Sequence, residues 1–146
     1  MPELAQVITE HLPYLQDLTE EQAARKPTPD VWSAKEILGH LIDSGVNNHA
    51  RFVLSSVQDD LHLSGYNQND WVSVGAWQER HWADLVALWA TYQGQLAHII
   101  AHLPPASLAH SLRIGESERL TLSFVAEDYV RHQLHHLAQI RERAGV

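Results

Sequence analysis

The chain has 146 residues, 18 acidic against 10 basic side chains, a net charge of −8 at neutral pH, and no cysteine. This length suits a single domain, residues 1–146, with enough apolar content to bury a core without disulfides. The missing cysteines exclude thiolate metal ligands, and the acidic balance excludes duplex nucleic acid, whose phosphates need clustered lysine and arginine. With no signal peptide or membrane-spanning apolar run visible, we expect a soluble, cytoplasmic protein.

The first predicted helix covers residues 2–19, where apolar residues recur at helical spacing. Pro13 lies inside this helix and is expected to kink or interrupt it, because proline removes a backbone hydrogen bond. Pro27 and Pro29 then predict a loop, since the residue before a proline avoids helical geometry.

A second helix is predicted from Ser33 to about residue 57. Ser33 and Glu36 form a capping-box pattern, in which each side chain bonds the other residue's backbone amide. His40 lies on the apolar side of this helix, so we expect it to face inwards, where a lone histidine is usually an ordinary core residue. Gly39 beside it either leaves room for a close helix neighbour or is tolerated at a cost of about 1 kcal/mol.

Residues 58–75 form a long, polar, turn-rich connection. Connections of this length in compact domains are usually functional or loose. Tyr66, Asp70 and Trp71 in this segment are candidates to line the mouth of a pocket. The two aromatic rings are equally suited to anchoring the loop on the bundle.

One continuous third helix is predicted over residues 76–102, with a broad apolar surface. His98 and His102 fall in its last turns, where histidine is favourable against the helix dipole. Residues 106–120 then predict a short hairpin or irregular crossover, too small for a substantial sheet. Thr121 is the expected cap of the last helix.

The last helix carries three histidines within a turn and a half. His132 and His136 project from one face, one turn apart, whereas His135 points about 100° away. A pair at this spacing can chelate one divalent cation through neutral imidazole nitrogens. Taken alone, the pair is typical of ordinary, partly buried histidines, because 11 histidines supply such a spacing by chance and do so again at His98 and His102.

Four helical segments with long connections predict an all-α four-helix bundle, a fold that builds metal sites from side chains on facing helices. His40 would then join His132 and His136 in a three-histidine set that leaves coordination positions open, as catalytic sites require. Asp128, one turn before His132, either orients the His132 ring by accepting a hydrogen bond or pairs with Arg131 in solvent.

Several segments of the chain resemble, in the same order, motifs of the DinB-like, YfiT-like superfamily of metalloenzymes. The second-helix motif is Trp-Ser-Ala-Lys-Glu-Ile-Leu-Gly-His-Leu at residues 32–41, followed by Asp43, Asn47, Asn48 and Arg51. The middle-loop motif is Gly-Tyr-Asn-Gln-Asn-Asp-Trp at residues 65–71. The C-terminal motif comprises residues 120–122 and 132–140.

This resemblance implies a bundle that holds a divalent metal, nickel or zinc, on His40, His132 and His136. Members are described as metal-dependent hydrolases, relatives transfer or isomerise with low-molecular-weight thiols such as bacillithiol and mycothiol, and homodimers are common. The middle-loop motif often has an acidic residue where this chain has Asn67. Asp70 is therefore the nearest acid–base candidate.

The leading hypothesis is an enzyme whose metal lowers the pKa of a thiol or of water and presents the anion to a small-molecule electrophile. In the thiol version Tyr66 and Trp71 shape the pocket, and Arg51 binds a substrate carboxylate if it points inwards. In the hydrolase version Asp70 helps to move protons. The alternatives are a non-catalytic bundle that binds a metal or small ligand, and a metal-free bundle whose histidines merely pack.

Overall fold

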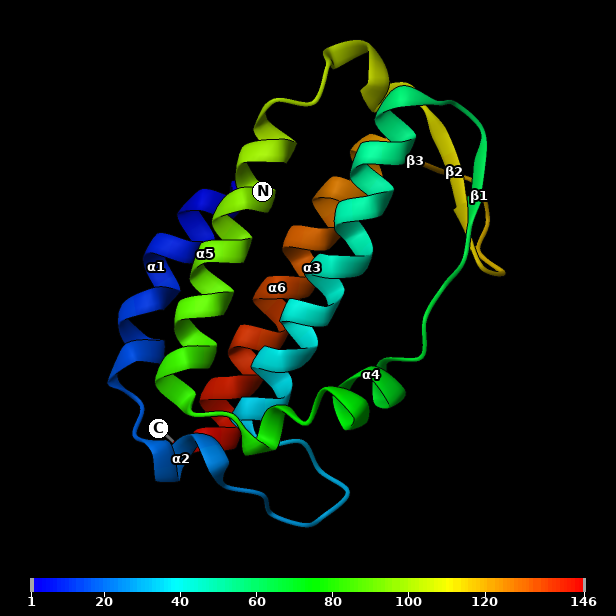
Figure 1. Cartoon of the computed structure of the whole chain (residues 1–146). Helices are drawn as coiled ribbons and strands as arrows, with labels where there is room; N and C mark the ends of the chain where they lie inside the picture. Colours follow the sequence, from blue (N-terminus) through cyan, green and yellow to red (C-terminus); the bar gives the residue numbers. More distant parts are fainter. Residues whose placement is uncertain (1, 146) are drawn as a thin grey trace.

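The computed structural model describes residues 2–145, and its main feature is four long helices that lie side by side (Figure 1). These helices are α1 (Leu4–Asp17), α3 (Ala34–Val57), α5 (Trp82–Ala101) and α6 (Leu122–Ala144). α3 packs against both α5 and α6, and α1 packs against α5. The predicted four-helix bundle is confirmed. Within residues 2–145, no helix has the length and apolar character that a bilayer crossing requires.

Two of the long helices begin where their capping residues predicted. The Ser33 hydroxyl accepts a hydrogen bond from the Glu36 amide (3.2 Å), while Glu36 Oε1 accepts one from the Ser33 amide (3.1 Å). Thr121 Oγ1 accepts a hydrogen bond from the Phe124 amide (3.1 Å) and starts α6. These caps fix the register of the two helices that carry the histidines.

Other helix boundaries differ from the prediction. The single helix over residues 76–102 is wrong, because Ala76 has a left-handed backbone (φ 51°), a short η1 (Trp77–Glu79) follows, and α5 begins only at Trp82. The apolar periodicity of the sequence continues through the turn at Ala76, so the pattern gives no sign that the helix is interrupted there. Pro13 is exposed and does not interrupt α1, which runs through it. A short helix, α2 (Glu20–Ala24), was not predicted.

The long connections form a small three-stranded sheet at one end of the bundle (Figure 1). β2 (Ser111–Ile114) and β3 (Leu120–Thr121) make the antiparallel hairpin expected in residues 106–120, after a 3-10 turn, η2 (Pro105–Ala109). β1 (Leu61–Leu63) pairs in parallel with β2, and α4 (Gln68–Gly75) follows it. The supposed loop of residues 58–75 is therefore partly regular structure.

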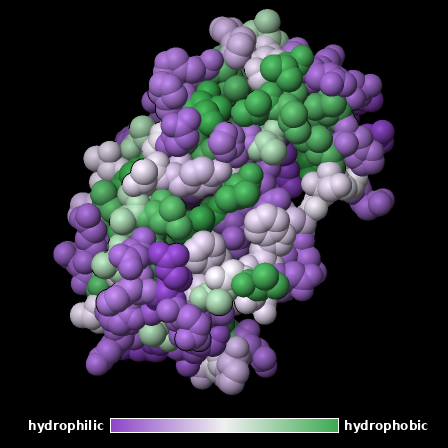
Figure 2. Space-filling model, viewed as in Figure 1, coloured by the Kyte–Doolittle hydropathy of each residue, from purple (hydrophilic) through white to green (hydrophobic). Residues whose placement is uncertain are grey.

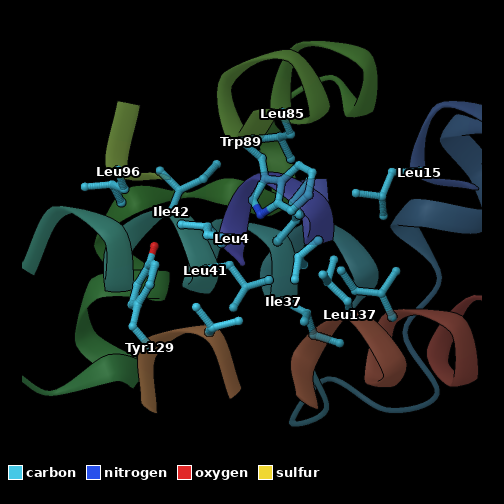
Figure 3. Close-up of a cluster of buried hydrophobic side chains, with 14 of the residues drawn as sticks. Leu4, Leu15, Ile37, Leu41, Ile42, Leu85, Trp89, Leu96, Tyr129 and Leu137 are labelled. Atoms are coloured by element: carbon cyan, nitrogen blue, oxygen red, sulfur yellow. The ribbon is translucent and has the colours of Figure 1, made fainter. Parts of the chain in front are cut away.

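Large apolar side chains from all four long helices fill the space between them. Figure 3 shows Trp89 of α5 among leucine and isoleucine side chains of the neighbouring helices, and Trp89 is fully buried. The surface is mixed, but Figure 2 shows hydrophobic side chains gathered at the end of the molecule where α3 finishes. Exposed apolar residues on this helix are Val46, Val53, Leu54 and Val57.

Gly39 is the point at which η1 docks on α3. The Trp77 ring lies so close that a Cβ on Gly39 would stand 2.1 Å from Trp77 Cγ. Trp77 Nε1 donates a hydrogen bond to the buried Asp43 carboxylate (3.1 Å), one turn along α3. Instead of the close helix neighbour expected beside Gly39, the structure has a tryptophan ring from the connection before α5. This contact holds the segment that follows α4 against the bundle.

We predict that Gly39→Ala lowers the free energy of unfolding by about 1–3 kcal/mol, the usual cost of overpacking, because the methyl group displaces the Trp77 ring. Gly94→Ala on α5 is the matched control. A Cβ there meets nothing within 4 Å, so the gain in helix propensity should stabilise the protein by up to about 1 kcal/mol. Urea denaturation measures both changes. Equal stabilisation by the two substitutions would contradict the Trp77 contact.

Candidate metal centre

Three histidines from two helices meet where α3 packs against α6. His40 comes from α3 and His132 and His136 come from α6, and one ring nitrogen of each lies within 4.8 Å of the others. Nε2 of His40 is 3.2 Å from Nε2 of His132. The ring centroids of the three pairs are 4.5–5.0 Å apart. The structure thus brings together the three histidines that the sequence selected.

Gln139 fixes the tautomer of His136. His136 Nδ1 lies 2.8 Å from Gln139 Oε1, an oxygen that can only accept, so Nδ1 carries the proton. The lone pair is then on Nε2, on the other side of the ring. Metal-binding histidines commonly donate their second N–H in this way. The sequence interpretation missed this role, although Gln139 lies one turn after His136 on the same helix.

His40 is the most deeply placed of the three, with 1% of its surface exposed. The Trp32 ring covers it, with ring centroids 5.1 Å apart. Its Nδ1 has no hydrogen-bond partner among residues 2–145. A buried nitrogen without a partner costs free energy. The other ring nitrogen, Nε2, is the one that faces His132.

Burial keeps all three imidazoles neutral. It lowers the pKa of His40 to about 3, with smaller contributions from His132 and His136. It also lowers the pKa of His132 to about 4, although the nearby Asp128 carboxylate acts in the opposite direction. The pKa of His136 is lowered by burial too, partly offset by its hydrogen bond to Gln139. At neutral pH the cluster therefore offers lone pairs rather than positive charges.

This donor set fits a borderline divalent ion. Two nitrogens bound at 2.0–2.1 Å to one tetrahedral ion lie about 3.3 Å apart, and the His40 and His132 nitrogens are 3.2 Å apart. Neutral imidazoles are the form that coordinates metals, and three of them leave at least one position open. The residues present therefore fit the metal that the resemblance implies.

A cavity of about 170 Å³ opens beside His132. Side chains of α3 and the middle connection make its polar wall, namely Ser44, Asn48, Arg51 and Tyr66. Asp128 lies on the α6 side, and the apolar wall consists of Ile114, Leu120, Phe124 and Val125. A larger cavity of about 650 Å³ lies between α1, α5 and α6 and is lined by none of the three clustered histidines. Of these two cavities, only the smaller one has a clustered histidine, His132, among its lining residues.

Two predicted substrate-binding residues, Arg51 and Tyr66, line the cavity beside His132. Burial raises the pKa of Tyr66, whose ring lies edge-on to Trp71 with centroids 5.6 Å apart. Trp71 is not among the cavity-lining residues and packs behind Tyr66. Asp128 lines the cavity and lies 3.6 Å from Arg131, the ion pair considered in the sequence interpretation.

Asp70 is exposed in the first turn of α4 and does not line this cavity. Its backbone amide donates a hydrogen bond to Asn67 Oδ1 (3.1 Å), which makes Asn67 the N-cap of α4. The departure from the family motif at Asn67 therefore has a structural role. An acid–base role for Asp70 stays a prediction.

The sequence profile described as the DinB superfamily matches residues 3–140. The chain is 24% identical over 132 residues to a Bacillus mycoides protein, covering 88% of this chain and 76% of that one. It is 22% identical over 124 residues to an Oceanobacillus iheyensis protein (85% and 72%), and 24% identical over 112 residues to a Bacillus subtilis protein (76% and 63%). All three relatives are named "Putative metal-dependent hydrolase".

Two solved structures share the fold. YfiT from Bacillus subtilis, described as "a probable metal-dependent hydrolase with an unusual four-helix bundle topology", matches with a TM-score of 0.82 at 23% identity, covering 97% of this chain and 83% of that one. A mycothiol-dependent maleylpyruvate isomerase matches with a TM-score of 0.75 at 12% identity. This match covers 94% of this chain but only 57% of the isomerase.

We predict that the protein, purified without chelators and incubated with nickel or zinc, retains about one equivalent of metal per chain. His40→Ala and His136→Ala should lose it, because two imidazoles hold such an ion far more weakly than three. His98→Ala is the matched control, since His98 and His102 form the other pair at this spacing but are exposed. Elemental analysis by mass spectrometry measures the content. No metal in the parent, or equal loss in His98→Ala, would contradict the centre.

The lowered pKa values also predict how the metal-free protein responds to pH. Below pH 6.5 the unfolded chain protonates histidines that the folded chain keeps neutral down to about pH 4 for His132 and about pH 3 for His40. Unfolding therefore takes up protons, and its free energy falls as the pH falls through this window.

Each such histidine contributes a slope of up to about 1.4 kcal/mol per pH unit. Urea titrations in chelator at pH 7, 6 and 5 should show a shallower fall in His40→Gln than in the parent. Parallel pH profiles for the two proteins would contradict the neutral, buried state of His40.

Proposed function

Because this chain belongs to the DinB superfamily, we propose that it is a metal-dependent enzyme that acts on a small molecule. The observation that carries the proposal is the convergence of three neutral histidines beside a cavity. His40, His132 and His136 would hold nickel or zinc, which three imidazole donors suit. When bound, such a metal supplies a Lewis acid that lowers the pKa of a thiol or of water.

The residues around the centre prepare it for that chemistry. Gln139 orients the His136 ring, and the Trp32 ring shields His40 from solvent. The half-buried Tyr66 lines the cavity beside His132. Trp71, packed against Tyr66, acts as its support.

The two versions of the reaction differ in what is activated. The names of the curated relatives favour hydrolysis. The sequence proposed Asp70 as the acid–base residue for this version, but Asp70 does not line the cavity beside His132. The name of one structural neighbour, a mycothiol-dependent isomerase, favours the thiol version. In that version the thiol is transferred to an electrophile or assists its isomerisation. In both versions the Asp128 carboxylate lies beside His132, where its effect on the pKa of that ring is smaller than the opposing effect of burial.

The homodimer expected from the family resemblance stays a prediction. The exposed valines of α3, namely Val46, Val53 and Val57, offer an apolar surface on which two copies would pack. Such a surface lies on α3, the helix that carries His40.

Two parallel assays of the metal-loaded protein distinguish thiol transfer from hydrolysis. One contains a chloronitrobenzene electrophile with N-acetylcysteine, and the other contains a nitrophenyl ester and no thiol. Transfer predicts turnover that requires the thiol and falls at least a hundredfold in His136→Ala. Hydrolysis predicts ester turnover that added thiol leaves unchanged. One equivalent of metal with no turnover of either substrate would instead support a non-catalytic, metal-binding bundle.

A further inference from the structure

Arg51 carries a charge that nothing in the described chain neutralises. Its guanidinium is half-buried and forms no ion pair among residues 2–145. Its one hydrogen bond runs from Nη1 to Asn48 Oδ1 and is long, at 3.4 Å. A guanidinium has five N–H donors, so most of them lack a protein partner. No Arg51 nitrogen is among the enclosed atoms without a partner, so its free donors stay accessible to an anion that enters the cavity.

The guanidinium is nevertheless held in one direction. Asn48 is buried, and its Nδ2 donates to the Ser44 carbonyl oxygen (2.8 Å), which fixes the amide. The amide oxygen is thereby presented to Arg51. On the other side the Tyr66 ring centroid lies 5.9 Å from Arg51 Cζ, a cation–π distance. Arg51 is therefore positioned before any ligand arrives.

The cavity leads from the histidines towards Arg51. Ser44 lies one turn beyond His40 on α3, and Arg51 lies about 10 Å farther along the helix axis, with both side chains in the cavity wall. His132 lines the same cavity from α6. A ligand anchored at Arg51 thus extends towards the histidine cluster.

Charges on the facing helix restrict which anion fits. Asp128 of α6 lines the cavity, and its side chain, 60% exposed, lies 3.6 Å from Arg131, which is 45% exposed. A second anionic group near α6 would meet the Asp128 carboxylate and be repelled. The volume of about 170 Å³ is also well below that of pockets for drug-sized ligands, which start at about 300 Å³.

We propose that this cavity selects a small substrate with a single carboxylate, which Arg51 binds while the reactive end of the substrate lies at the histidines. Arg51 is then a specificity-determining residue, and Asn48 is the residue that positions it. Planar, forked donors match a carboxylate better than a point charge does, so lysine should be a poor replacement. The proposal names the substrate class for the function proposed above and rests on it.

Binding of benzoate, benzamide and isophthalate, measured by ligand-observed NMR titration, tests this assignment. Benzamide is the neutral match of benzoate, and isophthalate adds a second carboxylate. Benzoate should bind at least tenfold more tightly than either. Arg51→Met should weaken benzoate at least tenfold, Arg51→Lys by less, and neither should change benzamide. Arg80→Met, at an exposed arginine, is the matched control and should change nothing.

The titration is repeated with His136→Ala, because a carboxylate could bind a metal directly. Binding to Arg51 predicts that benzoate affinity survives in His136→Ala, whereas binding to the metal predicts its loss there and overturns the proposal. If the parent holds no metal but still binds benzoate through Arg51, the enzymatic function fails while the carboxylate site stands.

Thermal stability provides a second readout. An arginine with only a structural role would destabilise the fold when replaced by methionine, whereas removing an unpaired charge should leave the melting temperature unchanged or higher. A lower melting temperature with unchanged benzoate affinity would overturn the proposal.

Discussion

The packing of α3 against α6 is the constraint on which the site depends. Two rigid helices supply the donors, His40 from one and His132 with His136 from the other, and the 3.2 Å between the His40 and His132 nitrogens exists only while the helices stay in contact. The helix spacing sets the pair on α6, but only the tertiary contact supplies the third donor. The centre therefore forms only when α3 and α6 are packed together.

This arrangement puts polar groups where a core would otherwise be apolar. His40 is almost fully buried and keeps a nitrogen without a partner, while Arg51 keeps most of its donors free. Selection for stability alone would favour apolar side chains in place of His40 and Arg51. The two residues lie along one face of α3, where an ion would use Nε2 of His40 and an anion would use the free donors of Arg51.

Local signals predicted the parts of the molecule that local chemistry determines. The capping residues Ser33 and Thr121 correctly predicted where the two histidine-bearing helices, α3 and α6, begin. Helical spacing correctly predicted that His132 and His136 share one face of α6. The corner at Ala76 could not be predicted, because Trp77 has the apolar character of a helix residue and is held instead by tertiary contact with Gly39. The pairing of β1 with β2 joins segments far apart in sequence, and three-residue strands carry no periodic signal.

Two features of the middle connection could also be seen only in the folded structure. Asn67 is the N-cap of α4, and Asp70 lies outside the cavity beside His132.

X-ray absorption spectroscopy of the metal-loaded protein tests the central claim most directly, because it observes the donor atoms themselves. The account predicts about three imidazole nitrogens at 2.0–2.1 Å for zinc, with the remaining positions filled by oxygen from solvent. The His40→Ala variant should show at most two imidazoles. A shell made only of oxygen, or an imidazole count that His40→Ala leaves unchanged, would contradict a centre built between α3 and α6.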